Sequence, residues 1–302
     1  MKRKIAKLDL QQEDSLDDNW KDKFSNLMMD IETSGYRATG LILVKYNDSI
    51  QTLKQETNAT NFLEIENVKV ALNQNLKSIV GHCRFPTKGD AKFNKNNHPF
   101  SYGNTIIVHQ GILWNDEQLK KKYEFKPEGE TDSWIIVHLI EKYRKEGKTV
   151  LEAINELHQE LEGNWAVTLV DKLEPEKLYL FCRKKEFKVN YFPDDEIFFF
   201  STEDRKLDKY NVQVYNYFDY FQELKSVKVA ELMVKDNQCL ILGGEKVVEF
   251  YNIAEPIKSN DWFGGKKKKE YGRREDGTWG YLGDQQKVEN DNNSLTPIPL
   301  KI

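Results

Sequence analysis

The sequence has no apolar run that approaches the ~18 residues needed to cross a membrane, so we expect no membrane-spanning helix. The basic residues 1–4 lead into residues 5–10, which are too few and too charged for the apolar core of a signal peptide. Cysteine is also scarce: positions 83, 182 and 239 lie far apart, without the spacing of a metal site or a disulfide framework. We therefore expect a reduced, cytoplasmic protein.

Neither sign of charge is in excess, because 45 basic residues face 49 acidic ones and the net charge is −4. This balance makes nucleic-acid binding an unlikely function. The five histidines show no zinc-ligand spacing, so we expect no metal site and no cofactor. Of these, His138 and His158 are expected on the surfaces of helices.

The order of the periodic segments is strands, then helices, then strands again, which is typical of the α+β class rather than of alternating βα units. We expect one domain over residues 1–254. Thr131 is expected to cap the longest internal helix, with Asp132 in its first turn. The expected helices cover residues 14–30, 116–123, 131–144 and 150–161. The expected strands cover residues 4–10, 40–46, 79–84, 105–109, 165–170, 178–183 and 196–201. Two further strands are expected within 227–251, with a turn at Gly243 and Gly244.

Beyond residue 254 the composition changes. Six of the 17 glycines, a run of four lysines at 266–269 and an asparagine-rich stretch fall in this segment. We interpret residues 255–302 as a flexible, charged and aromatic C-terminal tail. Its tryptophans and tyrosines lie among basic residues, a mixture that can contact single-stranded nucleic acid or insert into a protein partner. A solvated tail and a partner-binding tail both remain open.

Four motifs stand at the ends of strand-like runs, where polar groups and glycines can surround a small ligand. In chain order they are GHCRFPTKG at residues 81–89, NNHP at 96–99, VHQGILWN at 108–115 and ETDSWII at 130–136. Each motif alone is weak, because an arginine in this pattern can equally form a surface ion pair and a glycine can simply form a turn. Their shared order is the informative feature.

In sequence and order these motifs resemble those of the class II glutamine amidotransferases, such as the glutaminase domain of glucosamine-6-phosphate synthase, over residues 30–205. The resemblance implies a four-layer αββα sandwich of the N-terminal-nucleophile hydrolase type, with two antiparallel sheets. It also implies that glutamine, or a similar small amino acid, is the ligand. An ammonia acceptor would then come from another polypeptide.

The resemblance assigns roles to individual residues. Arg84 would hold the α-carboxylate of glutamine with a bidentate contact that lysine cannot imitate. Asp132 would contact the α-ammonium group, and Thr87 and His98 would complete the substrate-binding set. Gly111 would offer its backbone N–H to the oxyanion, next to Gln110. The family has asparagine in place of Gln110, and the extra methylene moves the amide donor by about 1 Å, which weakens a preorganised oxyanion hole.

The nucleophile is the main departure from the family, which uses a cysteine at the mature N-terminus. The first cysteine here is Cys83, between His82 and Arg84. Strand alternation places Cys83 on the opposite face from these two residues, where burial would raise the pKa of its thiol. The sequence thus favours a catalytically degenerate protein that binds a glutamine-like ligand or acts as a regulatory protein. The alternative is an active amidotransferase or amidohydrolase with an unusual nucleophile, or with an N-terminus different from the one printed.

Overall fold

The computed structural model describes residues 19–192, 197–203, 230–243, 248–253, 271–273, 279–281 and 297–298. The strand expected at residues 4–10 lies outside the described residues, as does most of the segment 255–302, so the domain boundary at residue 254 stays a prediction. No helix within the described ranges is long and apolar enough to cross a membrane.

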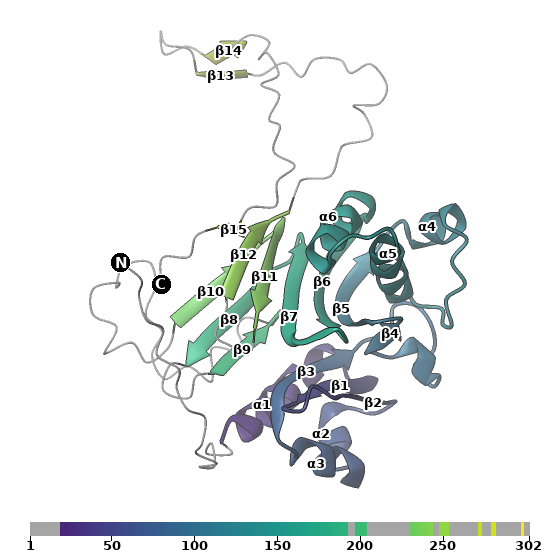
Figure 1. Ribbon diagram of the computed structural model, residues 1–302, viewed down its shortest axis with the longest axis vertical. Helices are drawn as coiled ribbons and strands as arrows, with labels where there is room; N and C mark the ends of the chain where they lie inside the picture. Colours follow the sequence, from purple (N-terminus) through teal and green to yellow (C-terminus); the bar gives the residue numbers. More distant parts are fainter. Residues whose placement is uncertain are drawn as a thin grey trace.

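All the described strands pair in antiparallel fashion, and most of them belong to three sheets (Figure 1). One three-stranded sheet has the order β2-β1-β3, formed by Ile50–Gln55, Ala38–Lys45 and Leu76–Arg84. A second has the order β10-β8-β9, formed by Ala230–Val234, Phe187–Phe192 and Ile197–Ser201. The seven-stranded sheet has the order β15-β12-β11-β7-β6-β5-β4, formed by Pro297–Ile298, Val248–Asn252, Gln238–Leu242, Glu174–Arg183, Gly163–Asp171, Thr105–Leu113 and Phe100–Tyr102. Strands β13 (Tyr271–Arg273) and β14 (Trp279–Tyr281) pair with each other.

The helices cover the outer faces of these sheets (Figure 1). Helices α1 (Asn19–Ile31), α2 (Ala59–Leu63) and α3 (Glu66–Leu72) accompany the β2-β1-β3 sheet. Helices α5 (Ser133–Lys145) and α6 (Val150–Glu160) cover the seven-stranded sheet, and α4 (Asp116–Lys122) connects β5 to α5. Two short 3-10 helices, Glu32–Ser34 and Asn94–Asn96, complete the described helical segments.

Three apolar clusters mark the contacts between successive layers. The alternation along β1 shows the principle: Leu41 and Leu43 pack toward α1–α3, whereas Ile42 and Val44 pack between the sheets. A third cluster joins α5 and α6 to the seven-stranded sheet. The sheet β10-β8-β9 also contributes to the cluster between the sheets and contacts α1 on its other face. The α+β class and the predicted layer order αββα are therefore confirmed.

Several local predictions were incomplete. Strands β2, β4 and β8 were not expected, and the region 227–251 was expected to form two strands, whereas β10, β11 and β12 start or lie within it. Strand β10 moreover pairs with β8 rather than with its chain neighbour β11. Pairing between distant segments decides the positions of β8 and β10, and a local hydrophobic pattern does not encode that pairing.

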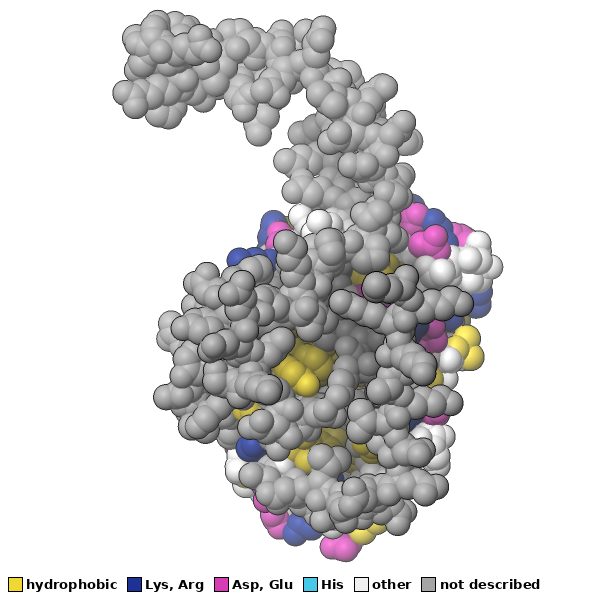
Figure 2. All heavy atoms as spheres, turned by 60° about the vertical axis from the view of Figure 1, so that its left-hand side comes forward, with side chains coloured by type: hydrophobic (Ala, Val, Ile, Leu, Met, Phe, Trp, Pro, Cys, Tyr) yellow, Lys and Arg dark blue, Asp and Glu magenta, His cyan; other side chains and the backbone are white. Residues whose placement is uncertain are grey.

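Charged side chains of both signs alternate along the described margin of the face in Figure 2. Where described residues can be seen there, basic and acidic groups lie beside one another and form no patch of a single sign. Such a mixture does not attract a polyanion.

Candidate functional site

The four sequence motifs meet where β3 and β5 end and α5 begins. Arg84 is the last residue of β3, Gly111 lies near the end of β5, and Asp132 directly precedes α5. The loop before β4 carries His98 and contacts Arg84 through Asn97. The fold thus brings together segments that lie about 50 residues apart in the chain.

Arg84 is buried, with 4% of its surface exposed, and neutral oxygens surround its guanidinium group. Nη1 donates to Oδ1 of Asn97 at 2.9 Å, and Nη2 donates to the carbonyls of Lys88 at 2.6 Å and Gly89 at 3.1 Å. Burial lowers the pKa of Arg84, and the nearby carboxylates of Asp132 and Asp90 oppose this shift. In the described part of the chain no carboxylate lies within ion-pair distance of Arg84. The guanidinium group is thus a buried cation whose hydrogen-bond partners among the described residues are all neutral.

Asp132 does not act as a helix cap through its side chain, and neither does Thr131. The sequence predicted that Thr131 caps this helix, but Asp132 is the N-cap residue and no side-chain cap bond forms. Instead, Oδ2 of Asp132 accepts the backbone N–H of Leu113 at 2.8 Å, which ties the start of α5 to the end of β5. Oγ1 of Thr131 is buried without a partner among the described residues. The side chain of Asp132 therefore joins the start of α5 to the end of β5 and does not cap its own helix.

Gln110 faces a carboxylate. Its Nε2 donates to Oε1 of Glu203, just after β9, at 3.4 Å. Because an ionised carboxylate only accepts hydrogen bonds, the amide nitrogen must point toward Glu203. The amide oxygen, Oε1, is buried without a partner in the described ranges. The amide donor at the predicted oxyanion position is thus engaged by a negative charge.

Gly111 has a backbone conformation that residues with a side chain rarely adopt, with φ at +134°. A Cβ atom there would lie 2.1 Å from the carbonyl oxygen of Asn164 and 2.7 Å from Cα of Trp165. Both contacts involve the backbone of β6, the strand paired with β5. Only glycine lets the two strands approach this closely.

We expect Gly111→Ala to destabilise the protein more than Gly147→Ala, which is a matched control. Gly147 also has a positive φ, at +88°, but a Cβ atom there would meet nothing within 4 Å. The two unfolding free energies should differ by about 2 kcal/mol, the cost of steric overlap against a backbone that cannot move aside. Urea denaturation of both variants measures this difference. Equal losses would show that β6 relaxes around the added methyl group.

Three histidines form a polar cluster beneath these groups. Nε2 of His82 donates to the carbonyl of His109 at 3.0 Å, and the rings of His82 and His98 lie 3.9 Å apart. Burial lowers the pKa of His82 to about 3, and it lowers those of His98 and His109 as well. His98, predicted to bind substrate, therefore lies among buried groups. Within the described ranges no group of three acidic, cysteine or histidine side chains is placed to hold a metal ion.

Two further sequence candidates differ in their surroundings. Thr87 is exposed in the loop after β3, next to Phe85, whose ring contacts Tyr36. Cys83 packs with the apolar cluster beneath α1, and its Sγ lies 3.6 Å from the carbonyl of Met28. Burial raises the pKa of Cys83 to about 12, so its thiol is protonated at neutral pH. These surroundings disfavour Cys83 as a nucleophile.

The expectation for the two remaining histidines was wrong, because both are buried. The ring of His138 lies between those of Tyr102 and Phe125, at centroid distances of 4.1 and 5.0 Å. His158 is fully buried, and its Nε2 lies 3.3 Å from the carbonyl of Cys182. Aromatic side chains from other segments cover the faces that helical periodicity alone would leave to solvent.

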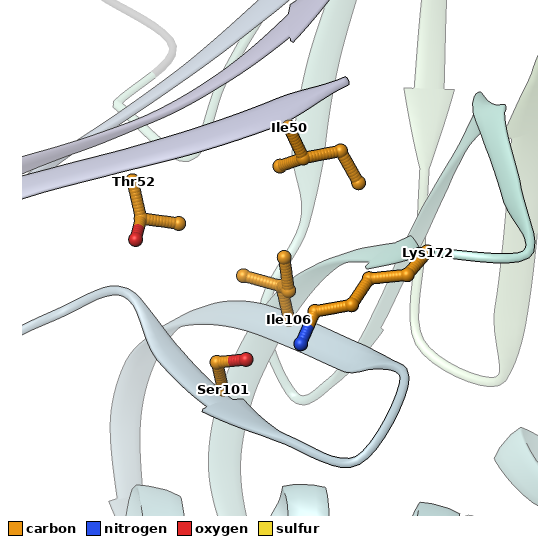
Figure 3. A pocket seen from close by; sticks show the side chains of 5 residues that line it. All are labelled: Ile50, Thr52, Ser101, Ile106 and Lys172. Atoms are coloured by element: carbon orange, nitrogen blue, oxygen red, sulfur yellow. The ribbon is translucent and has the colours of Figure 1, made fainter. Parts of the chain in front are cut away.

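A cavity of about 400 Å³ lies away from this site (Figure 3). Lys172 reaches across it, and its ammonium group donates to the carbonyl of Gly103 at 2.8 Å. Ile106 stands near the start of β5, whereas Gly111 is five residues further on, about 16 Å along the strand. This cavity is therefore separate from the cluster of motif residues. Its other lining residues are Ile50, Thr52 and Ser101.

Sequence reasoning missed three residues of the site: Asn97, Ser133 and Glu203. Asn97 accepts from Arg84, and Ser133 contacts two of the histidines. Glu203 contacts Gln110 across 93 residues of chain. Asn97 and Ser133 stand next to singled-out residues, so their position within the motifs was the available signal. No local pattern points to the contact of Glu203.

Comparison with known protein sequences agrees with the resemblance that the four motifs carry. Residues 82–209 match the family model for a glutamine amidotransferase domain. The glutamine–fructose-6-phosphate aminotransferase of Wigglesworthia glossinidia brevipalpis is 31% identical over 160 residues, which are 50% of this chain and 25% of that protein. The corresponding enzyme of Chlorobaculum tepidum is 29% identical over 194 residues, 61% of this chain and 31% of that protein. The match thus spans only about a quarter to a third of the length of these relatives.

Solved structures agree at the level of the fold. Glutamine phosphoribosylpyrophosphate amidotransferase from B. subtilis, complexed with ADP and GMP, superposes with a TM-score of 0.58 at 17% identity. The match covers 78% of this chain and 47% of that chain. A second structure, of the allosteric regulatory enzyme of purine biosynthesis, gives a TM-score of 0.59 with the same coverage. The shared architecture is the N-terminal-nucleophile hydrolase fold, as the sequence motifs implied.

Proposed function

Because this chain contains a class II glutamine amidotransferase domain, we propose that it binds glutamine, or a ligand with the same α-amino-acid group, without efficient hydrolysis of the amide. The observation that carries this proposal is the buried guanidinium group of Arg84, which has only neutral partners among the described residues. A buried charge is stable when an opposite charge accompanies it. A ligand carboxylate would supply that charge.

The proposed ligand is held by its two charged ends. Arg84 has five N–H donors, and its three hydrogen bonds to protein oxygens use one donor of Nη1 and those of Nη2, which leaves the N–H of Nε and one N–H of Nη1 for a ligand carboxylate. Asp132 keeps one carboxylate oxygen beyond the bond to Leu113, and this oxygen can accept from an α-ammonium group. The two side chains belong to different elements, so a ligand that spans them would be recognised by both charges together.

The surroundings of Gln110 support weak hydrolysis. Attack on an amide produces an oxyanion, which needs donors aimed at its position. Here the donor of Gln110 is directed to the carboxylate of Glu203, and a negative charge beside the oxyanion is unfavourable. The protonated thiol of Cys83 offers no ready nucleophile. A binding or regulatory role fits this combination.

An active amidotransferase is the second candidate function, and Gly111 favours it. This glycine keeps the close strand approach that a side chain would prevent, at the position where the resemblance places the backbone donor to the oxyanion. The named activity of the curated relatives transfers an amino group from glutamine. In this case an N-terminal or other nucleophile would complete the site.

Calorimetric titration with glutamine and an ammonia-release assay on the full chain of verified mass separate these candidates. We expect saturable glutamine binding and ammonia release at the level of the protein-free control. The variant Glu203→Gln removes the negative charge beside Gln110. It is the matched control that shows whether this charge suppresses hydrolysis at the oxyanion position. Turnover by the unsubstituted protein would contradict the degenerate site, and Cys83→Ala and Gln110→Asn would then locate the chemistry. Absence of glutamine binding would contradict the ligand assignment.

Location and protein partners remain proposals as well. The three cysteines are free in the structure, which supports the reduced environment of the cytoplasm. A protein partner that contacts residues 255–302 stays a prediction, because most of these residues lie outside the described ranges.

A further inference from the structure

The hydroxyl of Ser133 joins two buried histidines. Its Oγ lies 2.9 Å from Nδ1 of His109 and 3.3 Å from Nε2 of His98. Ser133 itself has 2% of its surface exposed. The carbonyl of His109 in turn accepts from His82, whose ring contacts that of His98 at a tilt of 36°. Four side chains from four segments thus form one connected polar cluster, which we call the serine–histidine cluster.

Each member of the serine–histidine cluster is close in sequence to a residue of the candidate ligand site. His82 precedes Arg84 by two positions on β3, and the Asn97 contact of Arg84 precedes His98 directly. His109 directly precedes Gln110 and Gly111 on β5. Ser133 directly follows Asp132. The cluster therefore connects every backbone segment that carries a proposed ligand contact.

The proton positions in this cluster are constrained. A carbonyl only accepts, so His82 carries its proton on Nε2. The hydroxyl of Ser133 has one proton, so it donates to one ring and accepts from the other. For neutral rings, if Nδ1 of His109 donates to the hydroxyl, the hydroxyl must donate to Nε2 of His98. If Nδ1 of His109 accepts from the hydroxyl instead, Nε2 of His98 must donate to it. In either case His98 and His109 adopt the same tautomer.

We propose that Ser133 is a positioning residue, which fixes the separation between the carboxylate-binding Arg84 and the groups at Gln110, Gly111 and Asp132. This inference rests on the proposed function. Loss of the hydroxyl leaves two buried imidazole nitrogens without a partner, and a buried unpaired polar group is costly. The rings, and the segments that carry them, then shift to recover hydrogen bonds. Ligand contacts on opposite sides of the site lose their common geometry.

Two measurements on the full chain test the proposal. Ring ¹⁵N spectra of histidine-labelled protein, assigned with single histidine variants, report the tautomers without any ligand. Glutamine titration of the unsubstituted protein, Ser133→Ala and Ser133→Thr reports affinity. We expect one shared tautomer for His98 and His109, about tenfold weaker binding in Ser133→Ala, and recovery in Ser133→Thr, which restores the hydroxyl.

The outcomes distinguish a failure of this positioning role from a failure of the proposed function on which it rests. Opposite tautomers for His98 and His109 in the unsubstituted protein would overturn the hydrogen-bond scheme, whether or not glutamine binds. Unchanged affinity in Ser133→Ala would overturn the positioning role and leave the proposed function intact. If the unsubstituted protein binds no glutamine, the proposed function fails and the positioning role fails with it. Equal unfolding temperatures for Ser133→Ala and Ser133→Thr would confirm that a difference in affinity is not a difference in folding.

Discussion

Acidification from pH 7 to pH 5 is expected to remove about 4 kcal/mol of folding free energy through His82 and His158 alone. Burial lowers the pKa of His82 to about 3 and that of His158 to about 4, whereas both are close to 6.5 in an unfolded chain. Each histidine that stays neutral in the folded state contributes about 2 kcal/mol over this interval, at 1.36 kcal/mol per pH unit below 6.5.

The sign follows from proton uptake. Between about pH 6.5 and pH 4 the unfolded state binds protons that the folded state cannot accept at these rings, so stability falls as the pH falls. The lowered pKa values of His98 and His109 act in the same direction. Carboxylates such as Glu160, whose pKa is also lowered, reduce the folding stability further only below about pH 4.5. The histidine effect therefore appears first on acidification.

Urea unfolding at a series of pH values measures this effect. The variant His158→Gln is the control, because it removes one titrating ring that lies outside the candidate ligand site. Its unfolding free energy should depend less steeply on pH, because this variant takes up about one proton fewer on unfolding between pH 6 and pH 5. A stability that stays constant across this range would show that the rings titrate freely in the folded protein.

Local signals in the sequence predicted much of the fold. Helix α6 matched its prediction to one residue, and its capping box explains why: Thr149 accepts from the backbone N–H of Glu152, whose side chain bonds back to the N-cap N–H. Strand β5 was recognised from a continuous apolar run that the structure buries on both faces. The residues of such elements themselves determine where each element begins and ends. The local signals also placed Arg84 at the end of its strand, whereas Gly111 lies inside β5 and Asp132 directly precedes α5.

Contacts between distant segments explain what the sequence did not predict. His138 was assigned to solvent because helical periodicity says nothing about Tyr102 and Phe125, which cover it. Asp132 was expected in the first turn of its helix and as a contact of the α-ammonium group, and the bond of its side chain across to β5 was not expected. The motifs therefore indicated which segments come together, and tertiary packing determined what each side chain contacts there.

The substitution Arg84→Lys should weaken glutamine binding at least about 100-fold, provided that glutamine is the ligand. Lysine keeps the charge but loses the planar guanidinium group, whose remaining N–H donors have fixed directions toward a ligand carboxylate. It also cannot replace the three bonds to Asn97, Lys88 and Gly89 that orient the group. Charge-assisted hydrogen bonds contribute about 1.5–3 kcal/mol each, and every 1.4 kcal/mol changes affinity tenfold.

The control is the same substitution at Arg144, a second arginine in a structural contact. Its Nη1 lies 2.6 Å from Oδ2 of Asp171, at the end of β6 that pairs with the start of β5. Arg144→Lys should lower stability but leave glutamine affinity unchanged, because that contact lies at the far end of β5 from Gly111. Calorimetric titration of both variants decides the matter. Equal affinity in Arg84→Lys and the unsubstituted protein would show that a point charge suffices, and the buried guanidinium would then serve the loop carbonyls rather than a ligand carboxylate.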